Sequence, residues 1–247
     1  MSRQRALIKY LATRLALAPL MIWLISTMVF LLLRIAPGDP VDAILGNRAN
    51  ESAREALRIK LGLDQPIINQ YISFLQNLLN GDLGEALITQ EPVKDIIAKA
   101  LPASIELGVC ALLIALIIGI SIGLFGTAKR EKKTDLFTRL YGISTYAIPP
   151  FWAAMIVQLI FAVLLGWLPV GGRFPPSLDE PTGTGFLLID SIINGNFIAL
   201  QGSLRHLLLP SFTLGILLSG IFSRSIRLNL EQTLKADYIE AAKTRGL

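Results

Sequence analysis

Residues 15–33 read LALAPLMIWLISTMVFLLL, and this uninterrupted apolar stretch decides the fold class of the chain. Roughly 20 apolar residues cross the hydrocarbon core of a bilayer as a helix. A signal peptide is the alternative, because basic residues precede the stretch. Signal cores, however, have only about 7 to 15 apolar residues, and the following Arg34-Ile-Ala-Pro-Gly-Asp39 is a poor cleavage site. We therefore expect an uncleaved first transmembrane helix.

The composition of the whole chain agrees with a membrane protein. Of its 247 residues, 53% are hydrophobic and 17% are charged, whereas soluble proteins average about 25% charged residues. The single cysteine, Cys110, excludes an internal disulfide. We expect an all-α integral membrane protein in a lipid bilayer, with no nucleic acid among its partners.

Three further apolar stretches predict three more spans. The uncharged run 140–172 is too long for one straight helix and is broken by Pro149 and Pro150. A break of this kind is tolerated where it packs on protein or lines a wet cavity, so Pro149, Pro150 and Trp152 are candidates for a pathway lining, with a plain kink as the alternative. Residues 186–200 are apolar but short, which favours a surface-lying segment. The expected spans are 107–128, 151–168 and 207–223.

Between the first two spans lies a polar stretch with helical periodicity. A charged amphipathic helix is expected over residues 51–61, and a second begins after Pro66 and ends at Gly81. Apolar residues recur at helical spacing in the second helix. This regularity favours a small folded lobe over a linker.

The second span contains Gly119-Ile-Ser121-Ile-Gly123, which has the spacing of a hydrolase nucleophile elbow. That elbow requires a strand, a turn and a helix together with partner His and acid residues, whereas this serine lies within an apolar helix. We interpret Gly119, Gly123 and Gly126 instead as a smooth face for close packing against another membrane helix.

The last residues, Asp237-Tyr-Ile-Glu-Ala-Ala-Lys-Thr-Arg-Gly-Leu247, predict a short helix over about residues 238–245. Asp237 and Glu240 have the spacing of a carboxylate capping box, and Gly246 suits a left-handed C-terminal cap. Two helical turns are not stable alone in water. Ala241 and Ala242 offer a low surface that lets another backbone approach, so this helix is expected to dock on a partner.

The positions of the basic residues predict the topology. The N-terminus, the loop 129–139 and the tail after Ser223 carry 4, 5 and 5 Lys or Arg, and the remaining 9 are spread over longer stretches. The positive-inside rule places these three segments in the cytoplasm. We expect a cytoplasmic N-terminus followed by the first transmembrane helix (1–35), an extracytoplasmic lobe (36–102), a transmembrane domain with three spans (103–230) and a cytoplasmic helix (231–247).

Several motifs resemble, in order, those of one family. The C-terminal stretch resembles the EAA loop of that family. The stretch Arg34-Ile-Ala-Pro-Gly-Asp-Pro40 resembles the end of its first span. Further matches are Leu61-Gly-Leu-Asp-Gln-Pro-Ile67, Gly81-Asp-Leu-Gly84, Leu101-Pro-Ala-Ser-Ile-Glu-Leu107 and Ile148-Pro-Pro-Phe-Trp152. Over almost its whole length the chain resembles the permeases of binding-protein-dependent ABC importers, in the dipeptide, oligopeptide and nickel branch.

The resemblance implies a type I ABC importer transmembrane domain in a bacterial inner membrane. Its partners would be two ATP-binding cassette subunits, a second homologous permease and an extracytoplasmic solute-binding protein. Residues of the EAA coupling helix would dock on an ATPase subunit, namely Asp237, Tyr238, Glu240, Ala241, Ala242 and Gly246. The substrate would be a dipeptide, oligopeptide, glutathione or nickel chelate.

The sequence has no Gly-x-x-x-x-Gly-Lys-Ser/Thr loop, so ATP is expected on partner subunits and no cofactor, metal site or catalytic residue on this chain. The family usually has two spans after its EAA loop, and these are expected to be missing here. An alternative function is a non-transporting membrane protein whose cytoplasmic helix recruits another partner. An intramembrane enzyme is disfavoured, because the only histidine, His206, lies near a membrane boundary.

Overall fold

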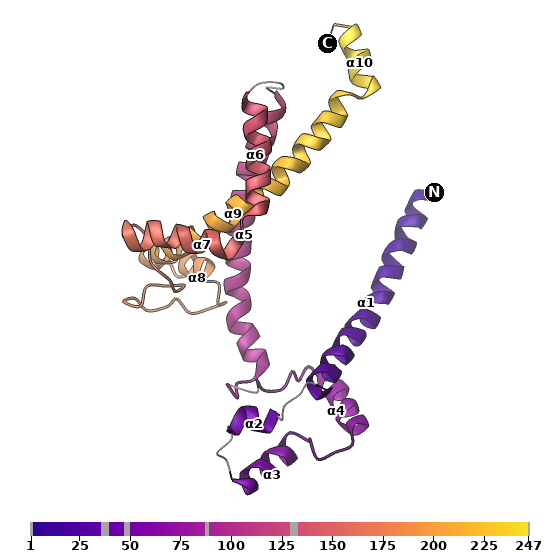
Figure 1. Ribbon diagram of the computed structural model, residues 1–247, viewed down its shortest axis with the longest axis vertical. Helices are drawn as coiled ribbons and strands as arrows, with labels where there is room; N and C mark the ends of the chain where they lie inside the picture. The colour runs from indigo at the N-terminus through magenta and orange to yellow at the C-terminus, as the bar shows by residue number, and fades with distance from the viewer. Residues whose placement is uncertain (1, 36–39, 47–49, 87–88, 129–132, 247) are drawn as a thin grey trace. The chain divides into compact units, whose positions relative to one another are not determined.

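The computed structural model describes residues 2–35, 40–46, 50–86, 89–128 and 133–246, almost all of them helices or their connections (Figure 1). Across this part of the chain the only β pairing is an isolated bridge between Glu85 and Pro92. The chain divides into two compact units, Met1–Ile96 and Ile97–Leu247. The predicted all-α fold is confirmed.

The first unit consists of a long apolar helix and a small group of short helices. α1 (Ser2–Ile35) includes the predicted span, and α2 (Pro40–Leu45), α3 (Glu51–Lys60) and α4 (Ile67–Leu79) follow it. Asn50 caps α3 by accepting a hydrogen bond from the Ala53 N–H. Gly62 and Gly81 follow α3 and α4 with φ of +64° and +76°, left-handed values that suit glycine at a helix end.

Contacts between α1 and α4 hold the first unit together. The hydroxyls of Thr27 and Tyr71 lie 2.6 Å apart, and the Phe30 ring packs against Tyr71 and Phe74 with centroids 5.3 and 5.4 Å apart. Arg54 of α3 forms a 2.7 Å ion pair with Asp42 of α2. The short helices are therefore a folded lobe attached to the C-terminal half of α1.

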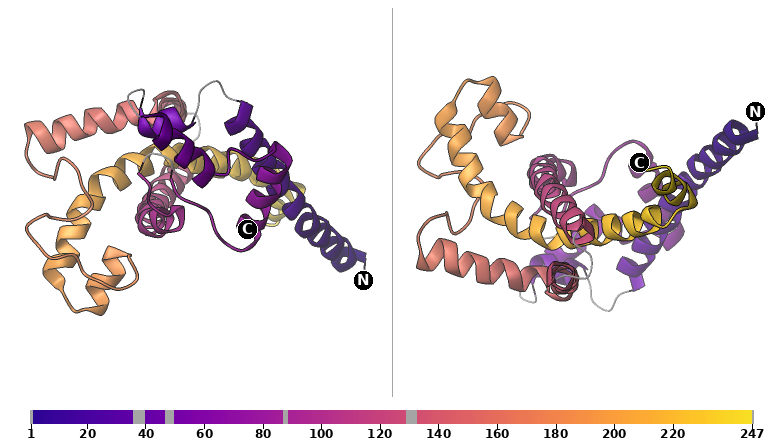
Figure 2. Two further views of the ribbon diagram at one scale, coloured as in Figure 1. Left: turned by 90° about the horizontal axis from the view of Figure 1, so that it is seen from below. Right: turned by 90° about the horizontal axis from the view of Figure 1, so that it is seen from above.

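The second unit contains the other long helices. Its elements are α5 (Val93–Ala128) from Ile97 onward, α6 (Lys133–Ala147), α7 (Pro150–Gln158), a π-helical segment η1 (Leu159–Leu164), α8 (Leu187–Ile193), α9 (Phe197–Leu234) and α10 (Asp237–Thr244). α9 contacts α6, α7 and α8. Both views of Figure 2 place α8 beside the first turns of α9, and α10 beyond its last turn.

Among the described residues, three helices are long and apolar enough to cross a membrane: Ala6–Ile35, Val93–Gly126 and Phe197–Leu234. The number rises to four if Leu136–Ala147 and Pro150–Leu164, which bend by 98° at the proline pair, form one broken span. The predicted break at Pro149 and Pro150 is confirmed, and the helix after it, expected over residues 151–168, covers residues 150–164 and ends in a π-helical segment.

The predicted last span, 207–223, lies within α9, which continues in both directions. Pro210 lies inside α9 without ending it, and the polar residues beyond the apolar stretch extend the same helix. The predicted surface-lying segment 186–200 comprises α8 and the first turn of α9. Charge marks where a helix leaves an apolar environment, but it does not stop the helix.

Small and hydroxyl residues form the interior of the second unit. Ala111 and Ala115 of α5 are fully buried, and Ser211 and Ser219 of α9 are at most 2% exposed. A Cβ placed on Gly119 would lie 2.7 Å from the Ser219 carbonyl oxygen, and one on Gly123 would lie 3.0 Å from that of Ser223. Gly126 similarly faces Thr138 of α6. The predicted glycine face is thus a close helix–helix contact.

Candidate functional site

The C-terminal helix differs in one detail from its prediction. α10 begins at Asp237, while Ala236 takes the cap position and no side chain caps the helix. The predicted capping box is therefore wrong, because Asp237 lies inside the first turn rather than before it. Asp237 and Glu240 still place negative charge in the first turn, which the helix dipole favours. Gly246 has φ of +79°, as predicted for a left-handed cap.

The residues predicted to dock on a partner lie on an accessible helix. Asp237, Glu240, Ala241 and Gly246 are exposed, Ala242 is half-buried, and the Tyr238 side chain is 63% exposed. No residue of α10 is buried within the described chain. An exposed aromatic ring beside two alanines gives this short helix an apolar surface that its own chain leaves uncovered.

α10 is joined to α9 by only two residues, Lys235 and Ala236. The backbone N–H groups of these residues donate to the carbonyls of Gln232 and Thr233. α9 itself is a 38-residue helix, which is about 57 Å long at 1.5 Å per residue. α10 therefore follows one long helix through a short, hydrogen-bonded connection.

The proline pair occupies the bend between α6 and α7. Pro149 precedes α7 in extended conformation and Pro150 is its first residue, where the missing N–H costs least. Both prolines and Trp152 are exposed. None of the three lines the cavity beside Glu106, the cavity between α6 and α9 or the cavity beside Trp167. Their role in a pathway remains a prediction.

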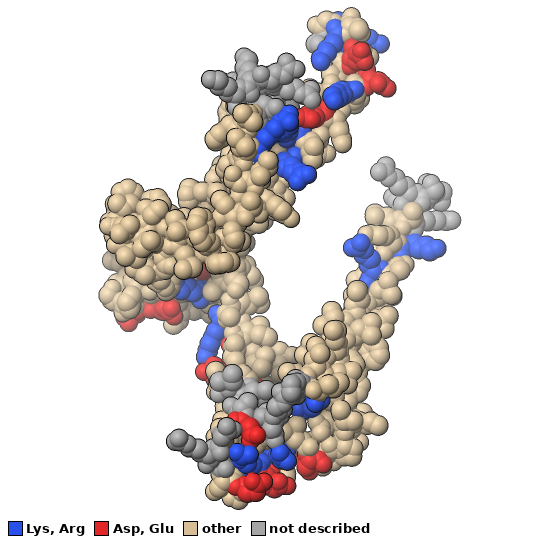
Figure 3. All heavy atoms as spheres, viewed as in Figure 1, with Lys and Arg blue, Asp and Glu red and all other residues tan. Residues whose placement is uncertain are grey.

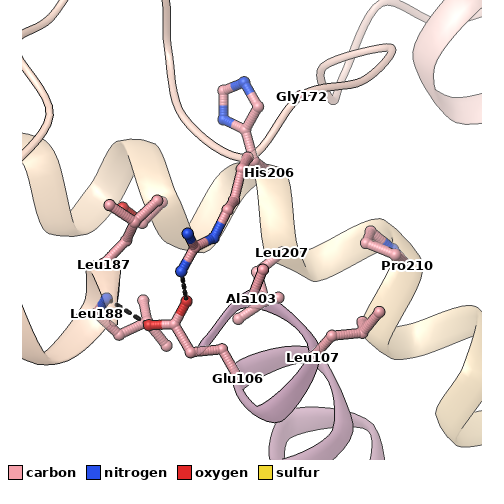
Figure 4. Close-up of a pocket in the computed structure, with 11 residues that line it drawn as sticks. Ala103, Glu106, Leu107, Gly172, Leu187, Leu188, His206, Leu207 and Pro210 are labelled. Atoms are coloured by element: carbon pink, nitrogen blue, oxygen red, sulfur yellow. Dashed lines mark hydrogen bonds and ion pairs between the residues drawn. The ribbon is translucent and has the colours of Figure 1, made fainter. Parts of the chain in front are cut away.

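A buried carboxylate connects α5 to the segment before α8. Glu106 of α5 is 9% exposed and accepts a hydrogen bond from Arg173 Nη2 at 2.9 Å and another from the Leu188 N–H at 2.8 Å. Figure 4 shows Glu106 reaching from its helix toward Leu188, with both contacts dashed. Arg173 Nη2 also donates to the Gly185 carbonyl at 2.6 Å. Arg173 Nη2 is thus shared between the carboxylate and a backbone carbonyl, whereas the buried Arg173 Nε has no hydrogen-bond partner among the described residues.

A second carboxylate organises the same segment. Asp190 of α8 is 2% exposed and accepts from the N–H and hydroxyl of Thr184, each at 2.8 Å, and from the Gly185 N–H at 2.9 Å. The Thr184 N–H is the main influence lowering the pKa of Asp190; burial opposes it, and the Thr184 hydroxyl, the Gly185 N–H and Arg173 add to the lowering. Residues 182–186 are therefore folded around an ionised carboxylate.

Glu106 and Arg173 lie at the edge of a cavity of about 250 Å³ between α5, α8 and α9 (Figure 4). His206, Leu207 and Pro210 of α9 form its other wall. The His206 Nδ1 lies 2.9 Å from the Gly202 carbonyl oxygen, and the described chain brings no group of three or more His, Cys, Asp or Glu together for a metal. The walls are mostly apolar, with the charges paired at one edge.

Sequence reasoning missed the roles of Glu106, Arg173 and Asp190. Glu106 lies in the Leu101-Pro-Ala-Ser-Ile-Glu-Leu107 motif, and it is the acidic residue that immediately precedes a long uncharged run. That position was the available signal. The partner of Glu106 is 67 residues away along the chain, and no periodicity within a single helix predicts such a contact.

These features define a class before any comparison: a multi-pass helical membrane protein with a lobe after its first helix and an exposed short helix after its last. Comparison with known proteins agrees. Residues 115–247 match the family described as binding-protein-dependent transport system inner membrane component, and residues 7–108 match its N-terminal companion family. The chain belongs to the binding-protein-dependent transport system inner membrane component family.

Curated relatives are peptide permeases by name. The chain is 37% identical to the probable D,D-dipeptide transport system permease protein DdpB of Escherichia coli (strain K12), over 90% of this chain and 66% of the relative. It is 33% identical to the di/tripeptide transport system permease protein DppB of Pseudomonas aeruginosa (strain UCBPP-PA14), over 98% of this chain and 72% of the relative. The dipeptide transport system permease protein DppB of Alkalihalophilus pseudofirmus is 34% identical to the chain, over 94% of this chain and 69% of the relative. The chain thus spans about two thirds of these relatives.

Proposed function

We propose that this chain is the membrane permease subunit of an ATP-driven importer of peptides, and that α10 is the element on which an ATPase subunit docks. The observation that carries the proposal is the exposed α10 at the end of a family-matching region, joined by two residues to the longest helix. ATP would be bound and hydrolysed by two partner subunits, since this sequence has no Gly-x-x-x-x-Gly-Lys-Ser/Thr loop.

The contacts of α9 support a mechanical coupling. α9 carries α10 at one end, packs on α6 at its middle, and at its other end lines the cavity beside Glu106. The Tyr141 hydroxyl of α6 lies 2.5 Å from the Ser219 hydroxyl of α9, and the backbone of Gly220 lies against Thr145. Movement of the docked helix would therefore shift α9 and α6 together, alternating access between the two sides of the membrane.

The remaining assignments follow the topology. The chain would lie in the bacterial inner membrane with residues 1–14 and 231–247 in the cytoplasm and the lobe 36–102 outside. A second homologous permease would complete the pathway, with Pro149, Pro150 and Trp152 at the bend as its candidate lining. An extracytoplasmic binding protein would deliver the substrate. The names of the relatives favour a di- or oligopeptide over glutathione or a nickel chelate.

Docking is tested by changing α10 without disturbing the membrane helices. The chain is co-expressed with the two candidate ATPase subunits and purified through a tag on this chain. Glu240→Lys reverses a charge in the first turn, and Gly246→Val forces a branched side chain into a left-handed backbone. We expect both variants to insert normally but to lose most of the co-purified ATPase.

Glu55→Lys is the matched control, because Glu55 is an exposed acidic residue of α3 in the other unit. It should retain the ATPase at the level of the unmodified chain. Equal ATPase recovery from the control and from both α10 variants would refute the docking role, and so would labelling of α10 from outside sealed cells.

A further inference from the structure

We propose that the cavity between α6 and α9 binds the phosphate headgroup of an anionic phospholipid, with the acyl chains lying along the apolar outer surface of the same two helices. The cavity measures about 440 Å³, within the range of about 300–1,000 Å³ typical of small-ligand sites. It is separate from α10 and from the cavity beside Glu106, and the proposal does not depend on ATPase docking.

The charge of the cavity is the first observation. Three arginines line it, Arg139 from α6 and Arg224 and Arg227 from α9, and no Asp or Glu is among its lining residues. Arg227 Nε donates to Glu231 at 3.1 Å, one turn farther along α9. Arg224 forms no ion pair with any described carboxylate. Guanidinium groups match phosphate geometry with paired hydrogen bonds.

Figure 3 shows blue side chains gathered where α6 lies beside the C-terminal half of α9, against largely uncharged atoms toward α7. The site therefore lies at a boundary between a charged and an apolar surface. Basic pockets between membrane helices at such boundaries suit lipid headgroups.

The apolar half of the cavity is the second observation. Proceeding along α6 away from Arg139, the lining continues with Gly142, Ile143, Tyr146 and Ala147. Ile143 is 65% exposed and Tyr146 is 88% exposed. A cationic end followed by an exposed apolar wall fits an amphiphile with an anionic head. A free phosphate would use only the cationic end and leave the apolar wall uncovered.

Hydroxyl groups complete the floor of the cationic end. Thr138 and Ser223 line the cavity and are 6% and 3% exposed. Gly142 leaves space beside them, since a Cβ built there would meet no atom within 4 Å. A substitution at Gly142 can therefore reduce the volume of the cavity without clashing at its first side-chain atom and without altering any charge.

The experiment measures lipid retained by the 247-residue chain. Protein in dodecyl maltoside micelles is titrated with phosphatidylglycerol or phosphatidylcholine and observed by native mass spectrometry. We expect one phosphatidylglycerol per chain to be retained preferentially. Arg224→Gln should weaken retention about fivefold, the effect of one basic residue near an anionic lipid surface. Arg205→Gln, the same loss of charge on the same helix outside this cavity, should have no effect.

Gly142→Leu supplies an independent variant that fills the cavity and leaves the arginines unchanged. It should also weaken phosphatidylglycerol retention, and circular dichroism should give unchanged helix content for all three variants. Equal retention of the two lipids, or equal retention by the unmodified chain and Arg224→Gln, would overturn the proposal. Displacement of the lipid by glycerol 3-phosphate at equal concentration would overturn the lipid assignment in favour of a soluble phosphate.

Discussion

Glu106 Oε2 lies 2.9 Å from Arg173 Nη2, while the other oxygen of the same carboxylate accepts a hydrogen bond from the Leu188 N–H at 2.8 Å. One side chain of α5 is thereby attached to a loop and to the helix that follows the loop. Its carboxylate is buried, whereas about a third of the Arg173 side chain is exposed. Glu106 therefore links α5 to the segment that contains α8 through an ion pair and a backbone hydrogen bond.

We expect Glu106→Gln to destabilise the second unit by about 1–3 kcal/mol. Removing the charge leaves the Arg173 guanidinium without its ion-pair partner. Because Arg173 is partly exposed, the loss of stability should be smaller than for a fully buried pair. Gln retains an oxygen for the Leu188 N–H, so the variant reports mainly on charge. Thermal unfolding in detergent measures the change. Glu180→Gln, an exposed acid of the same loop, should leave the unfolding temperature unaltered.

Acidification should release the loop around Asp190. Because its folded-state pKa is lowered, the ionised carboxylate contributes stability above its ordinary range near pH 4, and that stability is lost as pH falls through the folded-state pKa. Hydrogen exchange at Thr184 and Gly185 should accelerate in this window. Asp190→Asn should exchange rapidly at every pH; protection that is equally high in this variant would contradict the explanation.

The contact between α5 and α9 should distinguish two glycines of the same helix. At Gly119 a new Cβ would lie 2.7 Å from the Ser219 carbonyl oxygen and the Phe222 Cβ, whereas at Gly108 it would meet nothing within 4 Å. We expect Gly119→Ala to lower the free energy of unfolding of the second unit by about 1–3 kcal/mol, because the added methyl group overpacks the contact. Gly108→Ala should stabilise by about 0.5–1 kcal/mol through helix propensity. Similar unfolding temperatures for both variants would contradict the close packing.

The Tyr141 hydroxyl links α6 to α9 within hydrogen-bond distance of Ser219 Oγ. Tyr141→Phe should cost about 0.5–1.5 kcal/mol, the net value of one such bond. Ser219 Oγ also donates to the Ile216 carbonyl at 2.6 Å. The buried Ser219 hydroxyl therefore keeps one hydrogen-bond partner in the Tyr141→Phe variant. Adding Ser219→Ala to Tyr141→Phe should cost less than Ser219→Ala alone. Full additivity in thermal unfolding would argue against the direct bond.

Local signals in the sequence were sufficient for several elements. The uncharged run at residues 15–33 predicted α1, because apolar length is what a bilayer selects, and glycine spacing predicted the face of α5 that contacts α9. Glycines with positive φ end α3 and α4 where they were expected. Membrane family and fold class follow from such signals, since each depends on residues close together in the chain.

The sequence by itself therefore determined that this is an all-helical membrane protein with a lobe, a glycine-faced span and a short C-terminal helix. Only the tertiary structure decided that α9 extends from Phe197 to Leu234, that the break at the proline pair is a bend of 98°, and that Glu106 meets Arg173. Those outcomes depend on packing and on charges brought together from separate segments. Hydropathy measures how each residue partitions between water and lipid, and it contains no information about which distant residue becomes its neighbour.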